Sequence, residues 1–178
     1  KDHPAVEIVK NSQQVLNKAI LDLSDLTKSM HTDRIVEVGL ADSIRFELAS
    51  IKRTGILQVD FSVTGDEVVF DGHKSIFLYR MFQEMMNNIL KHSKATGVIV
   101  SLVYSADDTF IMEIEDNGRG FNVEEKRQNA SGSGVGLKSI FNRAGLIGAT
   151  IDVKSSPGTG TRITVELPYG EEINAQDK

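Results

Sequence analysis

Residues 84–92 read EMMNNILKH, residues 116–121 read DNGRGF and residues 132–137 read GSGVGL, and the order of these segments decides the predicted fold. A fourth segment, GTGT, follows at residues 158–161. The first segment places a carboxylate, an amide, an amine and an imidazole at helical spacing, and the other three are glycine-rich turns. An oxygen-bearing helix face beside glycine-rich turns is what a magnesium-nucleotide site needs.

Length and composition limit the class of protein. The chain has 178 residues, 40% of them hydrophobic and 25% charged, which suits one globular domain plus an appendage. A net charge of -5 argues against a nucleic-acid binder, and the absence of cysteine excludes disulfides and thiolate metal sites. No apolar stretch could cross a bilayer, and the chain opens on Lys1. We therefore expect a cytoplasmic piece of a longer protein, with any inner-membrane anchor in missing upstream regions.

A heptad pattern runs through residues 5–30. Its stripe consists of Val6, Val9, Gln13, Leu16, Ile20, Leu23, Thr27 and Met30. An amphipathic helix of this kind needs a partner, which predicts a coiled coil or a four-helix bundle. The alternative is that the helix folds back on the following domain.

The rest of the chain alternates between helical and extended patterns. We predict helices over residues 40–52, 75–93 and 137–146, and strands over residues 56–63, 97–104, 109–115, 149–155 and 161–167. Residues 117–133 are predicted to form a polar loop, and a polar tail begins at Tyr169. This order predicts an α+β two-layer sandwich, a mixed β-sheet covered on one face by helices.

The helix over residues 75–93 has two unlike faces. With Glu84 at zero degrees, Asn88 lies at about 40° and Lys91 at about -20°, so the three side chains share a face. The opposite face is predicted to be core and consists of Phe82, Met86, Ile89 and Leu90. Oxygen ligands suit Mg²⁺, whereas an ordinary solvated helix face is the plainer interpretation of the same residues.

The two glycine segments are each ambiguous alone. Asp116 ends an apolar strand and could accept a hydrogen bond from the amine of a base, although Asp-Asn-Gly also forms plain surface turns. The stretch GSGVGL opens a helix, whose free N–H groups attract phosphate, and a flexible linker over residues 127–134 is the alternative. The stretch does not match the dinucleotide fingerprint, because Leu137 occupies the position of its last glycine. It does not match the P-loop either, which needs a glycine immediately before the lysine, whereas Leu137 precedes Lys138 here.

Together, in this order, the segments resemble the catalytic ATP-binding domain of sensor histidine kinases, within the class shared with gyrase, Hsp90 and MutL ATPases. The resemblance covers roughly residues 38–168 and extends to the stretch LKSIFNRAGLIGATIDVKSSPGTGTRITVELP. Residues 1–37 then resemble the second helix of an incomplete dimerisation hairpin, and residues 169–178 are the tail. The stretch QEMMNNILKHSKA and a short lid are similar to the subfamily that pairs with NarL-type response regulators.

The resemblance implies a role for each site residue. Asp116 would bind the adenine amine of ATP, with Thr161 helping through water, while Asn88 would bind Mg²⁺ and Glu84 would polarise the metal or its water. Phosphates would contact Lys91 and His92. The nucleotide wall and lid would be shaped by Gly118, Gly120, Gly134, Gly136 and Leu137.

The acceptor of the phosphoryl group is not evident. The family phosphorylates a histidine in a sequence like E-L-H-D, and none of His3, His31 and His73 has such flanks. We therefore expect a fragment of a homodimeric protein histidine kinase that lacks its acceptor helix and passes phosphate to a response-regulator aspartate. Alternatives are a serine kinase of the anti-sigma type with the same fold, or a non-catalytic ATP-binding interaction module.

Overall fold

The computed structural model describes residues 35, 37–128 and 135–170, so the helix predicted over residues 5–30 lies outside the described residues. The helices are α2 (Leu40–Arg53), α3 (Gly72–Asn88), a π-helical turn η1 (Ile89–Ser93), α4 (Val123–Gln128) and α5 (Val135–Leu146). The strands are β1 (Gln58–Thr64), β2 (Gly97–Tyr104), β3 (Thr109–Asp116), β4 (Thr150–Ser155) and β5 (Thr161–Pro168). None of the described helices has the length and apolar character needed to span a bilayer.

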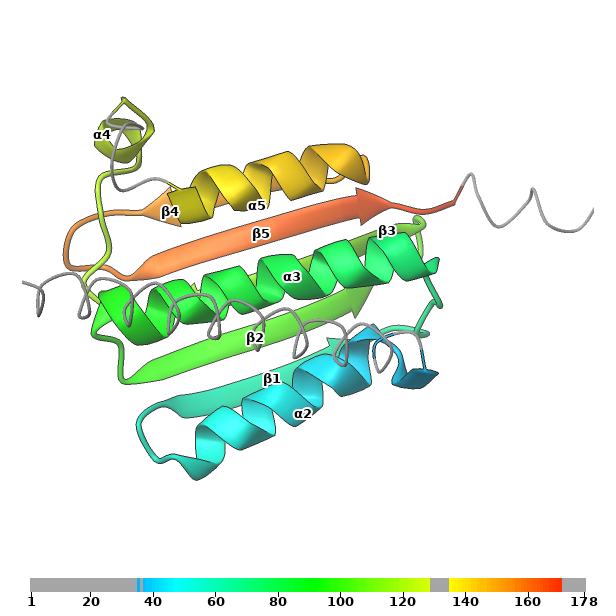
Figure 1. Cartoon of the computed structure of the whole chain (residues 1–178), viewed down its shortest axis with the longest axis horizontal. Helices are drawn as coiled ribbons and strands as arrows, with labels where there is room; N and C mark the ends of the chain where they lie inside the picture. The colour runs from blue at the N-terminus through cyan, green and yellow to red at the C-terminus, as the bar shows by residue number, and fades with distance from the viewer. Residues whose placement is uncertain (1–34, 36, 129–134, 171–178) are drawn as a thin grey trace, which may run out of the picture.

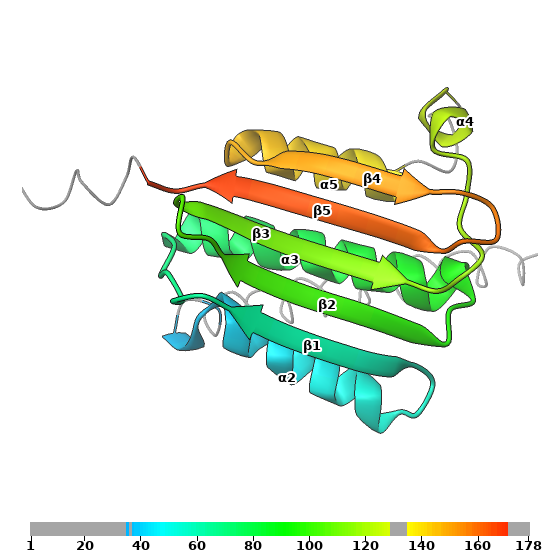
Figure 2. The same cartoon turned by 180° about the vertical axis from the view of Figure 1, so that it is seen from behind.

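The strands form one mixed sheet in the order β1-β2-β3-β5-β4. Strands β1 and β2 are parallel, because α3 carries the chain back between them, and the other neighbours are antiparallel. Helices α2, α3 and α5 lie on one face of the sheet (Figure 1), and the view from behind shows the strands in front of them (Figure 2). The predicted α+β two-layer sandwich is confirmed.

The core lies between the sheet and its helices. Alternate residues of β2 and β3 point inward and are buried, as the period of two requires. The largest fully buried side chains include Phe82 and Met85 of α3 and Phe110 and Met112 of β3. The outer face carries charge instead, where Arg162 Nε donates to Glu115 Oε2 at 3.0 Å.

Four aromatic rings close the end of the sheet at which α3 begins. Phe70 contacts Phe110, Tyr169 and Tyr104 with ring centroids 5.1, 5.9 and 6.3 Å apart. Tyr169 Oη also donates to Ser105 O at 3.2 Å. The prediction that Tyr169 belongs to a polar tail is therefore wrong, because this ring is part of the core.

The predicted bounds of α2 and α5 are met within two residues, whereas the start of α3 and the loop that follows β3 differ from the prediction for local reasons. Helix α3 begins at Gly72 rather than Ser75, because the Asp71 carboxylate accepts from the N–H groups of His73 and Lys74 and caps the helix. The predicted loop over residues 117–133 contains α4, whose Glu125 N–H donates to Asn122 Oδ1 at 3.2 Å. Both caps were readable in the sequence as polar residues before a helical stretch.

Candidate functional site

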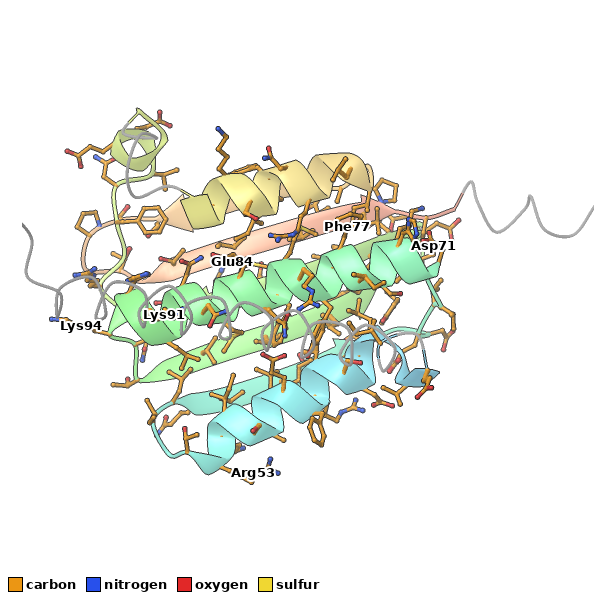
Figure 3. The ribbon with its side chains drawn as sticks, viewed as in Figure 1. Arg53, Asp71, Phe77, Glu84, Lys91 and Lys94 are labelled. Carbon is orange, nitrogen blue, oxygen red and sulfur yellow. The ribbon has the colours of Figure 1, made fainter. Side chains whose placement is uncertain are left out.

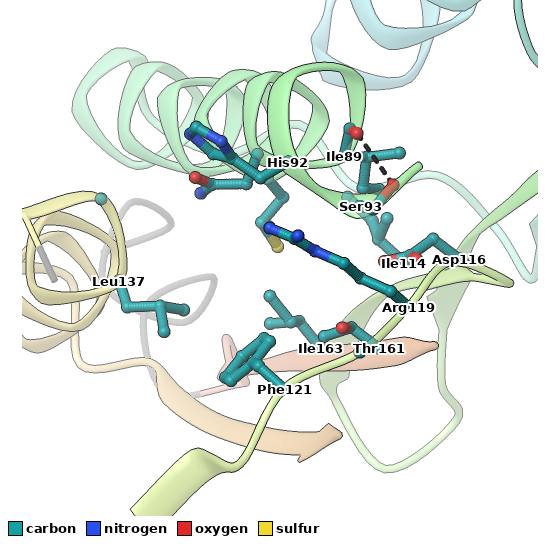
Figure 4. A pocket seen from close by; sticks show the side chains of 14 residues that line it. Ile89, His92, Ser93, Ile114, Asp116, Arg119, Phe121, Leu137, Thr161 and Ile163 are labelled. Carbon is teal, nitrogen blue, oxygen red and sulfur yellow. Dashed lines mark hydrogen bonds between the residues drawn. The ribbon is translucent and has the colours of Figure 1, made fainter. Parts of the chain in front are cut away.

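A pocket opens at the end of the sheet where α3 ends and α5 begins (Figure 4). It is lined by Met85, Asn88, Ile89, His92, Ser93, Ile114, Asp116, Arg119, Gly120, Phe121, Gly136, Leu137, Thr161 and Ile163. These residues come from the helix α3–η1, from the loop after β3, from the start of α5 and from β5. Described residues of the segments at 84–92, 116–121 and 132–137 therefore meet in one cavity, although these segments are remote in the sequence.

Asp116 forms the polar end of this pocket. It is the last residue of β3, and its side chain is buried at 5% exposure. Gly118 N–H donates to Oδ1 at 2.7 Å, while no described residue donates to Oδ2. Burial raises the pKa of the Asp116 carboxyl, and the Gly118 N–H bond opposes that rise. The free oxygen of a buried carboxylate is suited to bind a donor from a ligand.

The glycines around Asp116 allow backbone segments to touch. A β-carbon on Gly160, whose φ is +80°, would stand 2.0 Å from Asp116 O. One on Gly118 would stand 2.5 Å from Ser93 O, and one on Gly120 would stand 2.0 Å from Ser156 O. Only glycine fits such approaches, so the predicted importance of these positions has a steric basis.

The other polar end of the pocket lies on α3. A β-carbon on Gly136 would stand 2.4 Å from Glu84 Oε1 and 3.2 Å from Asn88 Nδ2, so the start of α5 rests on both side chains. Figure 3 shows Glu84 on the side of α3 that faces α5. Leu137 follows at the pocket wall, and Gly134 lies outside the described residues.

The π-helical turn changes the face that the end of the helix presents. A π-turn takes more residues per turn than an α-helix, so each later side chain is rotated backward. His92 consequently lines the pocket in line with Asn88, whereas Lys91 is exposed and does not line it. Leu90 is 44% exposed, so the prediction that it belongs to the core is wrong. A straight α-helix was assumed, and no residue pattern marks the π-turn.

Several residues of the pocket were not predicted. Arg119 and Phe121 belong to the quoted DNGRGF segment, which was the signal available for them, and Figure 4 shows the Arg119 side chain pointing into the pocket. The apolar lining of Met85, Ile114 and Ile163 could not be told from ordinary core residues. The Arg119 backbone is fixed at both ends, since its N–H donates to Ser93 O at 2.8 Å and its carbonyl accepts from Gly158 N–H at 2.6 Å.

The sequence profile described as "Histidine kinase-, DNA gyrase B-, and HSP90-like ATPase" matches residues 73–171. The chain belongs to this ATPase family. The matched range contains every described residue of the pocket, from Met85 to Ile163.

Named relatives support the same family. The sensor protein VraS of Staphylococcus aureus (strain COL) is 43% identical over 100 residues, which are 56% of this chain and 27% of that protein. VraS of Staphylococcus epidermidis is 43% identical over 98 residues, which are 55% of this chain and 27% of that protein. The match thus spans only 27% of the length of these relatives.

Solved structures share the fold of this ATPase family member. The histidine kinase domain of the blue-light activated histidine kinase from Erythrobacter litoralis EL346 has a TM-score of 0.61 at 20% identity, covering 76% of this chain and 63% of that one. Full-length ShkA in complex with AMPPNP has a TM-score of 0.62 at 15% identity, covering 91% of this chain and 39% of that one. At these identities the likeness concerns the fold alone.

Proposed function

We propose that this chain is the ATP-binding catalytic region of a two-component sensor histidine kinase, which transfers the γ-phosphate of ATP to a histidine on a dimerisation helix. The observation that carries the proposal is that Asp116, Asn88 and Gly136, from three segments remote in sequence, line one pocket. The names of the VraS relatives as sensor proteins support the same assignment.

The base of the nucleotide binds at the Asp116 end. Asp116 Oδ2 accepts a hydrogen bond from the exocyclic amine of adenine. Thr161, which is paired with Asp116 across β3 and β5, adds a hydroxyl group beside it. The apolar side chains of Met85, Ile114 and Ile163 cover the faces of the ring and exclude water. Binding the base here directs the ribose and phosphates toward Asn88 and the start of α5.

The residues at the other end fit Mg²⁺. This cation prefers oxygen ligands and takes one or two from protein, with phosphates and waters completing its shell. Asn88 supplies an amide oxygen in the pocket, and Glu84 supplies a carboxylate oxygen beside it, both against Gly136. Bound Mg²⁺ would neutralise charge on the β- and γ-phosphates during transfer.

Catalysis by this chain is positioning and electrostatic stabilisation. Asn88 would hold Mg²⁺ and Glu84 would orient the metal or its water, while His92 would contact the phosphates from the pocket wall. Lys91 lies outside the pocket in this structure, so its side chain would have to extend over the pocket rim to contact them. The attacking imidazole nitrogen forms a bond to the γ-phosphorus while the bond to the bridging oxygen breaks and ADP leaves. Glycines 118, 120, 134 and 136 and Leu137 shape the wall around this geometry.

Partners follow from the same proposal. The acceptor histidine belongs to a dimerisation hairpin, so the working protein is a homodimer, and the phosphoryl group passes to an aspartate of a response regulator of the NarL type. The heptad over residues 5–30 supports a helical partner.

Labelled ATP tests the proposal. The chain is mixed with a sensor-kinase dimerisation hairpin that supplies an acceptor histidine, Mg²⁺ and γ-labelled ATP. We expect label on the hairpin that is lost in acid and retained in alkali, and we expect Asn88→Ala to abolish it, with the exposed neighbour Asn87→Ala as the matched control. Acid-stable label on serine, or tight ATP binding without any transfer, would contradict the histidine assignment.

A further inference from the structure

One hydroxyl beneath the pocket joins three segments of the chain. Ser155, the last residue of β4, accepts from Phe121 N–H at 2.9 Å and donates to Gly160 O at 2.9 Å. Its Oγ also lies 3.0 Å from Thr161 Oγ1. Phe121 and Thr161 both line the pocket, whereas Ser155 does not. Ser155 therefore contacts two residues that line the pocket without lining the pocket itself.

The number of protons fixes the direction of these bonds. A serine hydroxyl has one proton to donate and two lone pairs to accept with. Gly160 O and Phe121 N–H can only accept and donate respectively, so they use the proton and one lone pair of Ser155. The bond to Thr161 is then made with the remaining lone pair, and the Thr161 proton is the donor. The reverse direction would leave Gly160 O without the Ser155 proton.

Thr161 consequently turns lone pairs toward the pocket. Its only side-chain partner among the described residues is Ser155, and its proton points to that partner. Asp116, its neighbour across the β3–β5 pair, also offers an accepting oxygen. Asp116 and Thr161 thus both present hydrogen-bond acceptors to the pocket.

We propose that Ser155 is a positioning residue that holds the Thr161 proton out of the pocket, so that the site selects a purine with an exocyclic amine at C6 over one with a carbonyl there. The inference rests on the proposed function, since it concerns the base of the bound nucleotide. An amine donates to these two acceptors, whereas a carbonyl oxygen beside them receives no hydrogen bond from either and loses hydrogen bonding on leaving water.

The variants that test this act on the same proton in two ways. Ser155→Ala removes the acceptor, so the Thr161 hydroxyl is free to turn and donate into the pocket. Thr161→Val removes the hydroxyl and keeps the shape, while leaving Ser155 with Phe121 and Gly160. Ser156→Ala, at the exposed next position, is the matched control.

The measurement is the ratio of dissociation constants for inosine triphosphate and ATP, determined by calorimetry with Mg²⁺ on the whole chain. We expect the ratio to fall by about threefold to tenfold in Ser155→Ala and in Thr161→Val, the range of one hydrogen bond. The double variant should show no further fall, because both changes act through one proton. Ser155→Thr, which keeps the hydroxyl, should restore the wild-type ratio, and Ser156→Ala should leave it unchanged.

Each outcome decides the matter. A wild-type chain that binds no ATP overturns the proposed function itself. Where ATP binds, an unchanged ratio in Ser155→Ala overturns the inference and leaves the proposed function standing, and additive effects in the double variant also overturn it. If Ser155→Ala binds ATP and inosine triphosphate more weakly by the same factor, Ser155 only stabilises the β4–β5 hairpin. Should Ser155→Ala not fold, Thr161→Val still decides, because a ratio like that of wild type contradicts the inference.

Discussion

Gly136 at the start of α5 lies against Glu84 of α3, so closely that a β-carbon there would stand 2.4 Å from Glu84 Oε1. The contact joins the start of α5 to the face of α3 that carries the Glu84 carboxylate and the Asn88 amide. Any change in how α5 packs on α3 is therefore felt directly at Glu84 and Asn88. This relationship makes Gly136 a structural part of the candidate site.

Gly136→Ala should weaken ATP binding. The methyl group would push the ends of the Glu84 and Asn88 side chains away from the positions they hold at the candidate site, and we expect about a tenfold loss of affinity, measured by calorimetry with Mg²⁺. Gly145→Ala in the same helix is the matched control, because a β-carbon there meets nothing within 4 Å. That control should raise stability by about 0.5–1 kcal/mol through helix propensity. Equal effects of the two variants on affinity would refute the contact.

Asp116→Asn should weaken nucleotide binding and raise the stability of the folded domain. The amide keeps an oxygen for Gly118 N–H but turns a donor toward the ligand, so we expect ATP affinity to fall by about tenfold or more. Removing a buried carboxylate should also raise the melting temperature at neutral pH, since burial raises the pKa of Asp116. Calorimetric scanning and ligand titration check both halves, and a variant that is less stable at neutral pH contradicts the second.

The same pKa gives the stability a pH dependence of known sign. The folded pKa of Asp116 lies above its unfolded value, so the stability from this group is fully present below the unfolded pKa. It is lost as the pH rises through the folded pKa. The difference in melting temperature between Asp116→Asn and wild type should therefore grow from acid to neutral pH and vanish in strong acid. A constant difference across that range would exclude titration of Asp116 as its cause.

Arg119→Ala should lower the binding affinities of adenosine and of ATP by the same factor. The Arg119 backbone is bonded to Ser93 and Gly158 beside Asp116, and its planar guanidinium points into the pocket, where it can stack on the base. We expect about a tenfold loss for both ligands, measured by competition binding. A loss that grows with the number of phosphates would instead indicate a phosphate contact. Arg162→Ala, on the outer face of the sheet beside Glu115, is the control and should change neither affinity.

Gly160→Ala should destabilise the domain far more than Gly158→Ala. Both glycines have positive φ, +80° and +86°, so each alanine carries the backbone strain of about 1–2 kcal/mol. Only at Gly160 would the methyl group also meet Asp116 O, at 2.0 Å, whereas nothing lies within 4 Å of a β-carbon on Gly158. The difference between the two unfolding free energies, from urea titration, isolates the contact. Similar unfolding free energies for the two variants would mean that the close approach of Gly160 to Asp116 O does not contribute to stability.

Most elements could be predicted because their signals are local. The strand Gly97–Tyr104 alternates in burial along its length and was predicted with its observed bounds. The start of α3 was misplaced by three residues because the cap at Asp71 was not read. The π-turn at Ile89–Ser93 could not be predicted, since it depends on how the helix end packs rather than on any residue type in it.

Some residues of the candidate site could likewise be predicted from the sequence, and others could not. Asn88, Asp116 and Gly136 were identified from residue type and order, and the structure brings them into one pocket. Arg119 and Ser155 were missed, because an arginine in a turn and a serine at the end of a strand have many ordinary uses. Their roles depend on what lies across from them, and Ser155 touches segments 34 and 5 residues away in sequence.

The sequence by itself therefore determined the layered α+β fold, the family and several of the residues that line the pocket, since periodicity and residue chemistry are properties of short segments. Only the tertiary structure decided that His92 rather than Lys91 lines the pocket and that Gly136 rests on Glu84. It also decided that one hydroxyl of Ser155 orders two walls of the pocket. These relations join segments distant in the chain, and the directions of their side chains are set by packing that no single segment encodes.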